Sequence, residues 1–542
     1  MVNNQTKKIY SVTLGAFFLG NLAWAQAGPT WVDTQTKSIR PPVTTMAALP
    51  AQPGTPMHVV VALKLRNRAQ LDQQVARMRA DPLHAQHLSK EAFLRQYAPL
   101  SSQVNQVVRY LQKQGFRNIR VADNRLLIQA DGTALTAGNA FNTSIRLYSQ
   151  GEHARFGNTR PAQVPAALGG TVLSIMGLQN VYKAHFMARP VAAGTLAATP
   201  KGVSGHEPFT FSAIYNGTKA PNASKATIGI IAQGDLTQTL ADLQTFQQKH
   251  KLNVPVDVVQ TGDASSDTSG LVEWNMDSQS SLGAAGGVAK QMLFYVAPTL
   301  ENNALTVAFN QAVSDNQAQA INVSLGECEN DAKNDGSADA QDQIFQTAVA
   351  QGQTFAVSSG DSGSDECGNG GTSQSYPAVS PYVVAVGGTT VTTSSNGSYL
   401  SESTWSGGGG GPSDTESAPD WQAQSGVLGS STQRGAPDIA FDGDPASGAL
   451  VLVNGAQQQV GGTSLSAPIF TGIWARMQSI RNNQAGFAGP TIYRLAKSKP
   501  KTFHDVTTGN NGSFSAKKGW DYATGWGSID IYALSQAIQQ GL

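Results

Sequence analysis

From about residue 206 to the end of the chain, short apolar runs alternate with longer segments of helical periodicity. The expected strands are 226–232, 254–259, 291–296, 320–325, 354–358 and 382–386, and the expected helices are 240–249, 273–285, 304–315, 341–351 and 469–480. A strand that is followed by a helix and then by another strand returns most readily to the same sheet in parallel. The pattern therefore predicts a doubly wound α/β sheet that is mainly parallel.

A smaller α/β unit is expected ahead of this sheet. Its predicted strands are 58–65, 119–121, 126–128 and 145–148, and its helical segments include 90–114. A stretch rich in Pro, Ala, Gly and Thr separates the two units, as a linker does. Because 542 residues exceed one ordinary core, we predict two domains, 28–188 and 206–542, joined by a linker at 189–205.

The N-terminus has the pattern of a secretory signal. Lys7 and Lys8 precede an apolar stretch at 9–24, and small residues follow at Ala25 and Ala27. This combination predicts a signal peptide at 1–27, and the stretch is too short and too interrupted for a good membrane span. No later run is long enough to cross a bilayer. We therefore expect a secreted, extracellular protein without a membrane anchor.

The composition is poor in charge. Charged residues make up 13% of the chain, about half the usual share of roughly 25%. A surface that depends little on ion pairs suits acid, where carboxylates become protonated, although a neutral extracellular protein with polar loops would have the same composition. The formal net charge of +1 argues against a nucleic-acid partner, which needs a clustered basic face.

The chain has two cysteines, Cys328 and Cys367. A metal site would need more ligands nearby, and a cysteine nucleophile would need a histidine partner. In an oxidising compartment, we expect the two to form one structural disulfide.

The most distinctive string is GGTSLSAP at 461–468, which leads into an apolar helix. Small residues let the backbone turn tightly, and the amide groups at a helix N-terminus stabilise negative charge nearby. The hydroxyls of Thr463, Ser464 and Ser466 would also serve as helix caps. A cap does not need the whole string, however, and we interpret Ser464 as a nucleophile.

A serine nucleophile of the usual kind needs a histidine base. The second unit contains His206, His250 and His504, and none of them lies in the His-Gly string that such a base usually occupies. We interpret all three as surface or core residues. Another group must then activate Ser464.

Two carboxylates offer the alternative. Glu273 and Asp277 are four residues apart, which places them on one face of the predicted helix. The pair could belong to a solvated face, but the rest of the helix is rich in Gly, Ala and Ser and is nearly uncharged, as a buried helix is. Adjacent carboxyls share protons, which prepares one of them as a base.

A third candidate is Asp361 in the string SSGDSG at 358–363, directly after a predicted strand. The string has likenesses to the trypsin nucleophile and to aspartic peptidases, but the first needs a histidine segment and the second needs another such triplet. A turn at a strand end is the plainer interpretation. In the functional interpretation, a protonated Asp361 donates a hydrogen bond to an oxyanion.

The glycine run 407–411 has a different explanation. It is too short for a phosphate-binding loop and lacks the Lys and Ser or Thr of one. We therefore expect it to be a flexible surface segment.

Together these strings resemble the sedolisins, the serine-carboxyl peptidases, over nearly the whole chain. The string DSQS at 277–280 and the two cysteines are most similar to the bacterial pepstatin-insensitive carboxyl proteinases. The resemblance implies that Glu273 is the base, that Asp277 orients it, that Asp361 stabilises the oxyanion and that Ser464 is the nucleophile.

The resemblance also implies an organisation for the chain. The domain 206–542 is expected to have a subtilisin-like fold and to act on proteins and peptides as an acid-acting endopeptidase. The domain 28–188 is expected to be a ferredoxin-like activation prodomain of the pro-kumamolisin type, which inhibits the enzyme until acid weakens the contact. Cleavage is then expected somewhere in 187–205, and the active enzyme is expected to be a monomer.

The C-terminal segment 503–530 is rich in Asp, Asn and Gly, which favour turns that expose carbonyl oxygens. A plain glycine-rich loop has the same composition, but the segment is similar to the sedolisin calcium loop. The resemblance implies one structural Ca²⁺, bound by the carboxylates of Asp505 and Asp521 and the main-chain oxygens of Val506, Lys517 and Gly519. Lys517 stands where the family often has glycine, a change that a main-chain ligand tolerates.

Two other functions are compatible with parts of the sequence. A subtilisin-like peptidase with an unrecognised histidine would work best near neutral pH. A secreted, calcium-dependent binding protein on an inactive peptidase fold would show no hydrolysis in acid.

Overall fold

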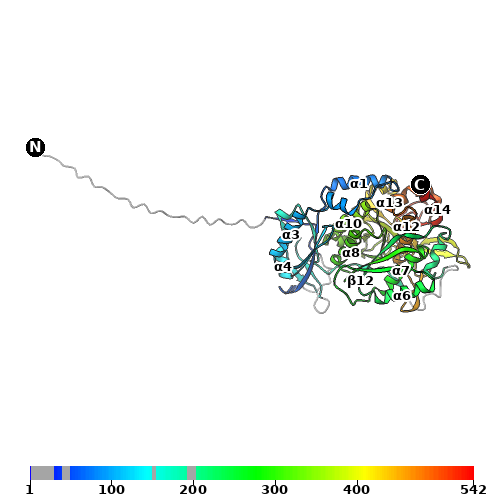
Figure 1. Ribbon diagram of the computed structural model, residues 1–542, viewed down its shortest axis with the longest axis horizontal. Helices are drawn as coiled ribbons and strands as arrows, with labels where there is room; N and C mark the ends of the chain where they lie inside the picture. The colour runs from blue at the N-terminus through cyan, green and yellow to red at the C-terminus, as the bar shows by residue number, and fades with distance from the viewer. Residues whose placement is uncertain (2–29, 40–48, 149–153, 192–202, 542) are drawn as a thin grey trace.

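The computed structural model describes residues 1, 30–39, 49–148, 154–191 and 203–541. The predicted signal peptide lies outside these residues except for Met1, and so do residues 192–202 of the predicted linker. In the described part, a smaller α/β domain lies beside a larger one, at the left of Figure 1. No helix in this part of the chain is long and apolar enough to span a membrane.

The smaller domain is built on an antiparallel sheet with the strand order β4-β5-β3-β9. The elements of this part are β1 (Trp31–Asp33), β2 (Leu49–Pro50), β3 (Pro56–Leu63), α1 (Arg68–Ala80), α2 (Lys90–Gln96), α3 (Ser101–Lys113), β4 (Arg117–Val121), β5 (Leu127–Thr133), α4 (Ala134–Ala140), β6 (Ile145–Leu147), β7 (Phe156–Asn158), β8 (Gln163–Pro165), β9 (Val172–Met176), β10 (His185–Phe186) and β11 (Arg189–Pro190). Along the chain, the sheet strands and the helices between them follow the order βαββαβ, which with this strand order is the ferredoxin-like topology.

The larger domain is built on an eight-stranded sheet with the path β13-β14-β12-β15-β17-β19-β20, and β23 also pairs with β19. Its elements are α5 (Phe211–Ile214), β12 (Ala223–Gln233), α6 (Thr237–Lys249), β13 (Val256–Gln260), α7 (Leu271–Ala284), β14 (Ala289–Ala297), α8 (Asn302–Asp315), β15 (Ala320–Val323), β16 (Leu325–Cys328), α9 (Glu329–Asp335), α10 (Ser337–Gln351), β17 (Thr354–Ser358), β18 (Ser375–Tyr376), β19 (Val384–Thr393), β20 (Tyr399–Thr404), β21 (Gly411–Ser417), α11 (Asp420–Ala423), β22 (Gln433–Ala436), β23 (Ile439–Asp442), β24 (Ala449–Val453), β25 (Ala456–Gly461), α12 (Thr463–Ile480), α13 (Ala488–Ser498), β26 (Phe503–His504), β27 (Ser528–Ile529) and α14 (Ile531–Gln539). Every pairing in the sheet is parallel except that of β19 with β20. The predicted fold class is confirmed.

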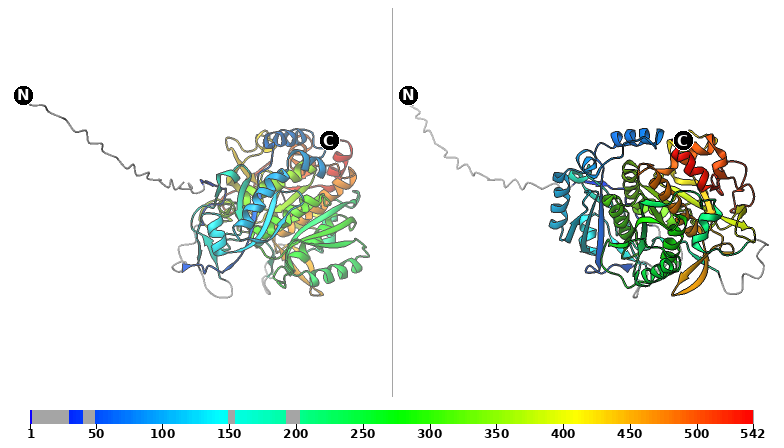
Figure 2. Two further views of the ribbon diagram at one scale, coloured as in Figure 1. Left: turned by 60° about the vertical axis from the view of Figure 1, so that its left-hand side comes forward. Right: turned by 45° about the vertical axis from the view of Figure 1, so that its right-hand side comes forward.

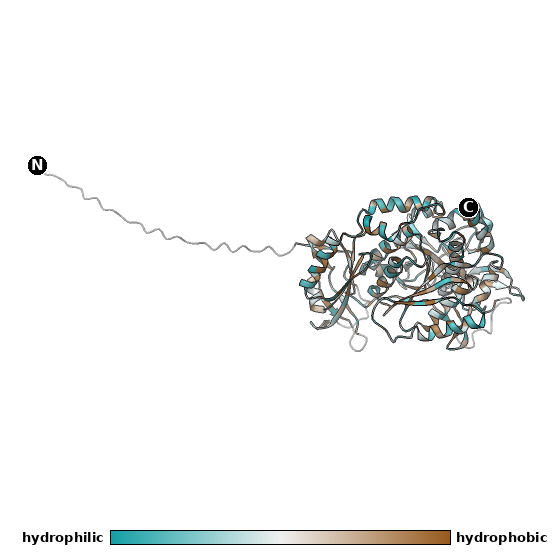
Figure 3. Cartoon of the chain, in the orientation of Figure 1, coloured by the Kyte–Doolittle hydropathy of each residue, from teal (hydrophilic) through white to brown (hydrophobic). Residues whose placement is uncertain are grey.

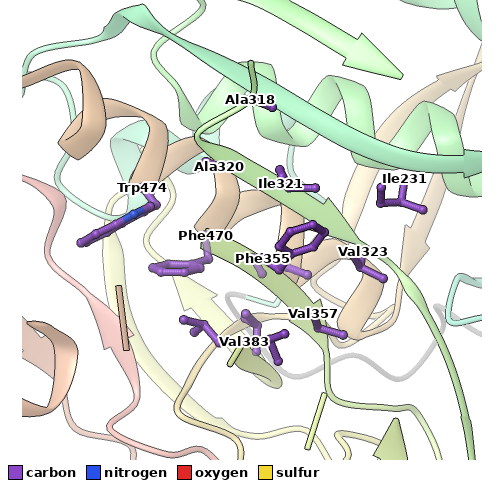
Figure 4. Close-up of a cluster of buried hydrophobic side chains, with 14 of the residues drawn as sticks. Ile231, Ala318, Ala320, Ile321, Val323, Phe355, Val357, Val383, Phe470 and Trp474 are labelled. Atoms are coloured by element: carbon purple, nitrogen blue, oxygen red, sulfur yellow. The ribbon is translucent and has the colours of Figure 1, made fainter. Parts of the chain in front are cut away.

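Helix α12 packs across the centre of this sheet, against β12, β15, β17, β19 and β23. It is buried on all sides over residues 463–479, and most of its side chains are apolar or small. Figure 4 shows its Phe470 and Trp474 beside Ile321, Phe355 and Val357 of the sheet. Helix α7 packs against α12, and α8 packs against α10, so that helical pairs cover the sheet (Figure 2). This packing fixes the first turn of α12 relative to the strands.

Strand β3 packs against both domains. Side chains alternate between the faces of a strand. Val59 and Val61 lie in the smaller domain's own core, whereas Val60 and Ala62 belong to the core of the larger domain. Helix α1 extends over the larger domain, and its hydrophobic residues alternate with hydrophilic ones in Figure 3. The smaller domain is therefore docked through an apolar sheet face and one amphipathic helix.

The chain crosses from one domain into the other through two short strands. His185–Phe186 (β10) pairs antiparallel with β16. Arg189–Pro190 (β11) pairs antiparallel with β25. The predicted linker thus begins as a strand of the larger domain, which the sequence did not predict.

Three local expectations need correction. The predicted helical stretch 90–114 is two helices, because Pro99 disfavours continuation and Ser101 starts a new one. The predicted strand 320–325 divides into β15 and β16. The glycine run is not a flexible surface segment, since Gly408, Gly409 and Gly410 are buried.

The two cysteines behave as predicted. Cys328 and Cys367 form a disulfide across 39 residues of sequence. The bond connects the end of β16 to the loop that contains Asp361.

Candidate active site

Ser464 is the second residue of α12 and is fully buried in this form of the chain. The turn before it depends on Gly462, whose φ of 108° lies in the left-handed region that favours glycine. A Cβ at Gly462 would lie 1.9 Å from the carbonyl oxygen of Met187 and 2.7 Å from Asp361 Oδ2. The glycine therefore leaves room for a main-chain carbonyl directly beside the start of α12.

Helix α7 places both predicted carboxylates in the interior. Glu273 is 1% exposed and Asp277 is fully buried. Burial raises the pKa of Glu273 well above its ordinary value, the nearby Asp277 charge raises it further, and hydrogen bonding with Ser464 opposes the rise. Burial likewise raises the pKa of Asp277, against hydrogen bonds from Ser324 and Asn322. The two groups hold protons in a range where exposed carboxyls are ionised.

Ser324 connects this pair to Ser464. Its hydroxyl donates to Asp277 Oδ1 at 2.6 Å, and its main-chain oxygen accepts the Ser464 hydroxyl at 3.4 Å. The Asn322 side chain in turn donates to the Ser324 hydroxyl at 2.9 Å. Both residues lie at the carboxyl end of β15, where the end of a central strand meets α12.

Asp361 stands in the loop after β17, with its side chain 1% exposed. Its Oδ1 accepts the main-chain N–H of Thr463 at 2.7 Å and the Thr463 hydroxyl at 2.9 Å. Its Oδ2 has no hydrogen-bond partner among the described residues. Burial raises the pKa of Asp361 to about 6, and the Thr463 hydrogen bonds and Arg189 act in the opposite direction. The carboxyl is therefore protonated in mild acid.

The buried glycine run supports this loop. The main-chain N–H of Gly409 donates to the oxygen of Gly360 at 2.8 Å. Glu366 packs against Gly360 and accepts the main-chain N–H of Ser362 at 2.7 Å. Burial raises the pKa of Glu366 to about 8. Neither the glycines nor Glu366 were predicted as site residues, because nothing in their local pattern distinguishes them from a surface loop.

The segment between β10 and β11 lies against these groups. The main-chain N–H of Ala188 donates to Glu273 Oε2 at 2.8 Å. The carbonyl of the preceding residue, Met187, is the one that lies against Gly462, on the side of this glycine that Asp361 Oδ2 also approaches. The peptide bond between Met187 and Ala188 therefore lies between the predicted base and the predicted oxyanion group.

Side chains of the same segment are seated in the larger domain. The Phe186 ring meets Trp274 edge-on, with the centroids 5.5 Å apart. Met187 is 1% exposed, and a Cβ at Gly326 would lie 2.7 Å from its Cε. On the other side of the bond, the Arg189 guanidinium approaches Asp361.

The structure thus brings together all four residues predicted for catalysis, Glu273, Asp277, Asp361 and Ser464. It brings none of the second unit's histidines to Ser464. In the part of the chain that the structure describes, His206 packs on Phe211, His250 stacks on Phe209, and His504 stacks on Tyr399.

The predicted calcium ligands come together at one turn. The main-chain N–H of Gly519 donates to both carboxylate oxygens of Asp505, at 3.1 and 3.0 Å, and that of Lys517 donates to Asp521 Oδ2 at 2.8 Å. Asp521 is 1% exposed, and burial raises its pKa. Val506 follows Asp505 directly. The described residues contain no group of three or more His, Cys, Asp or Glu side chains placed to hold a metal, and the predicted set has two such side chains.

Two family models match the chain. The pro-kumamolisin activation domain matches residues 46–181, and the subtilase family matches residues 266–527. The first lies in the smaller domain and the second covers Glu273, Asp277, Asp361 and Ser464.

Curated relatives match over most of their length. Sedolisin from Pseudomonas sp. (strain 101) is 47% identical over 95% of this chain and 93% of its own. Xanthomonalisin from Xanthomonas sp. (strain T-22) is 40% identical over 89% of this chain and 66% of its own, and kumamolisin from Bacillus sp. (strain MN-32) is 29% identical over 89% and 91%.

A solved structure agrees with these relatives. The structure of Pseudomonas sedolisin, a serine-carboxyl proteinase complexed with two molecules of pseudo-iodotyrostatin, is 49% identical, has a TM-score of 0.61, and covers 63% of this chain and all of its own. Sequence identity over nearly the full length, the activation domain and the subtilase fold agree: the chain belongs to the sedolisin family, the serine-carboxyl peptidases.

Proposed function

We propose that the chain is the zymogen of a secreted endopeptidase that works in acid, with Ser464 as the nucleophile and Glu273, Asp277 and Asp361 as its partners. The single observation that best supports this is the position of one peptide bond. The amide nitrogen of Ala188 contacts Glu273, and the carbonyl of Met187 lies against Gly462, on the side that Asp361 Oδ2 also approaches.

In the proposed reaction, the Ser464 oxygen bonds to a substrate carbonyl carbon as Glu273 takes the Ser464 proton. Asp277 shares its proton with Glu273, and protonated Asp361 donates a hydrogen bond to the developing oxyanion. The C–N bond then breaks as Glu273 returns the proton to the leaving nitrogen. Water, deprotonated by Glu273, hydrolyses the acyl-enzyme and restores Ser464.

The shifted pKa values of these carboxyls determine the pH range in which the proposed enzyme works. Asp361 has to be protonated, and its pKa of about 6 gives that state in mild acid. The Glu273–Asp277 pair has to retain one negative charge to act as a base, and its raised pKa values are those of carboxyls that share a proton. Activity should therefore fall as the pH rises through 6.

The zymogen is proposed to process itself at the bond between Met187 and Ala188. This assigns the first cleavage within the predicted interval 187–205. The contacts of Phe186 with Trp274, and of Met187 with Gly326, also favour an apolar or aromatic residue at each of the two substrate positions before the bond. The signal peptide predicted at 1–27 is proposed to direct export. The active form is proposed to be a monomer.

The turn near Asp505 and Asp521 is proposed to hold one structural Ca²⁺. Two carboxylates are held beside one turn, and no basic side chain in the described chain forms an ion pair with either. Carboxylate and main-chain oxygens are the ligands that Ca²⁺ prefers. With the carbonyls of Val506, Lys517 and Gly519, the residues fit such an ion, which would neutralise the buried charge of Asp521.

Ser464→Ala tests the proposal directly. The full-length chain, Ser464→Ala and the control Ser362→Ala are incubated with a denatured protein from pH 2 to 8, with and without pepstatin. We expect the unchanged chain and Ser362→Ala to hydrolyse the protein in acid despite pepstatin. Ser464→Ala should be inactive and should retain its smaller domain. Full activity of Ser464→Ala would rule out this assignment.

A further inference from the structure

Arg189 lies on the far side of the proposed scissile bond and reaches back to Asp361. Its Nε is 3.5 Å from Asp361 Oδ2, and its guanidinium also donates to the main-chain oxygen of Asp361 at 3.3 Å. The Arg189 side chain is 54% exposed, whereas that of Asp361 is 1% exposed. Strand β11 fixes this approach, because Arg189 is paired with Gly461 of β25.

The oxygen that Arg189 approaches is the one that catalysis needs. Thr463 occupies Oδ1 of Asp361 with two hydrogen bonds. Oδ2 remains free of hydrogen bonds in the described chain and lies on the same side of Gly462 as the Met187 carbonyl. A proton on Oδ2 would serve that carbonyl, but a guanidinium beside Oδ2 favours the ionised carboxylate instead.

The other titratable groups around Asp361 are carboxyls, and they cannot take the place of Arg189 beside it. Glu366 from the same loop and Glu273 from α7 both face it, and each is buried. Burial raises the pKa of Glu366 to about 8 and that of Asp361 to about 6, so Asp361 ionises before Glu366 as the pH rises. Among the described residues, Arg189 is the basic group that forms an ion pair with Asp361, and it lowers the Asp361 pKa.

We propose that Asp361 also recognises a basic residue at the second position after the scissile bond, and that in the zymogen Arg189 uses this contact to delay processing until acid protonates Asp361. The inference rests on the proposed function, because it takes Asp361 as the oxyanion group and Met187–Ala188 as the first bond cut. A proton and a basic side chain then compete for one carboxylate oxygen. The same competition applies to substrates, so peptides with Arg at this position should be cut at lower pH than peptides without it.

The zymogen test compares Arg189→Gln, Arg189→Lys and the unchanged full-length chain. Lys113→Gln, an exposed change of a basic residue on α3 of the smaller domain, is the matched control. Each is incubated from pH 3 to 8, and the rate of appearance of a new N-terminus at Ala188 is followed by mass spectrometry. We expect the alkaline midpoint of the rate to move up by about 0.5–1 pH unit in Arg189→Gln, to move less in Arg189→Lys, and to stay in place in Lys113→Gln.

A peptide test removes any effect of domain docking. The processed enzyme is given two peptides with the sequence of residues 183–191, one with arginine and one with its neutral isostere citrulline at the position of Arg189. We expect equal kcat/KM at pH 4, and about three- to tenfold faster cleavage of the citrulline peptide near pH 7.

An unchanged midpoint in Arg189→Gln, or loss of its processing at every pH, would overturn the inference, and so would equal cleavage of the two peptides at pH 7. Failure of the proposed function would give different results. If the proposed function were wrong, the unchanged chain would not gain an N-terminus at Ala188, or Ser464→Ala would still gain it.

Discussion

Ser324 touches both ends of the proposed catalytic group. Its hydroxyl donates to Asp277, and its main-chain oxygen accepts from Ser464. A hydrogen bond to a carboxylate favours the ionised form, so Ser324 keeps the pKa of buried Asp277 from rising further. If the Glu273–Asp277 pair is the base, we expect Ser324 to lower the pH down to which the pair retains its negative charge.

Replacing Ser324 by Ala should therefore move the acidic limb of the kcat profile to higher pH. The loss of one buried hydrogen bond to a charged group is expected to raise the pKa of the pair by about one unit and to lower kcat by about tenfold at the acidic end. The measurement is kcat against pH with a saturating peptide.

The control for this variant is Ser278→Ala, whose hydroxyl donates to the main-chain oxygen of Trp274 on the same helix and not to a carboxylate. It should leave the profile in place. An acidic limb that does not move in Ser324→Ala would show that Ser324 only fills space.

At the scale of elements, β16 and the Asp361 loop act as one unit. Strand β16 pairs with β10, which precedes the proposed scissile bond, and the disulfide joins its last residue to Cys367 beside Glu366. Glu366 in turn accepts the main-chain N–H of Ser362, next to Asp361. The disulfide therefore connects the strand that pairs with β10 to the loop that contains Asp361.

The double variant Cys328→Ser/Cys367→Ser tests this connection. A bond that closes 39 residues contributes about 2–4 kcal/mol to the free energy of unfolding. We expect a lower midpoint of thermal unfolding. We also expect a raised KM, because β16 is no longer bonded to the loop of Asp361. An unchanged KM in a variant that unfolds at lower temperature would limit the disulfide to a stabilising role.

The C-terminal turn supports a separate prediction about metal. If Ca²⁺ neutralises Asp505 and Asp521, a chelator should lower the midpoint of thermal unfolding of the unchanged protein, and Asp521→Asn should abolish that response. Asp530→Asn is the control, since Asp530 caps α14 by accepting the N–H of Ala533 and lies outside the predicted ligands. The control should lose some stability but still respond to the chelator. If the chelator left the unfolding midpoint of the unchanged protein in place, the proposal of a structural Ca²⁺ at this turn would be wrong.

At the scale of the molecule, the two domains share one apolar interface. Val60 and Ala62 of β3 lie in the larger domain's core, and Arg79 of α1 forms an ion pair with Asp420 at 3.2 Å. The apolar part of this interface does not titrate, so acid alone does not remove it. Cleavage between Met187 and Ala188 would cut the covalent connection and leave the docked domain to dissociate.

The sequence predicted what depends on local pattern. Alternating apolar runs identified the parallel sheet, and an uncharged helix around Glu273 and Asp277 identified buried carboxylates. It could not predict β10 and β11, because two-residue strands have no periodicity and their partners are more than 100 residues away. The buried glycine run was misread for the same reason, since segments distant in the sequence, with Ser359 beside Gly409 and Tyr522 beside Gly410, leave no room for side chains there.

The most direct test of the central claim is to identify the residue that a serine-directed fluorophosphonate labels in the processed enzyme in acid. We expect one adduct, on Ser464, which disappears in Glu273→Gln because the base is lost. An adduct on Ser362, or labelling of Ser464 that persists undiminished in Glu273→Gln, would contradict the assignment of Ser464 as a nucleophile activated by Glu273.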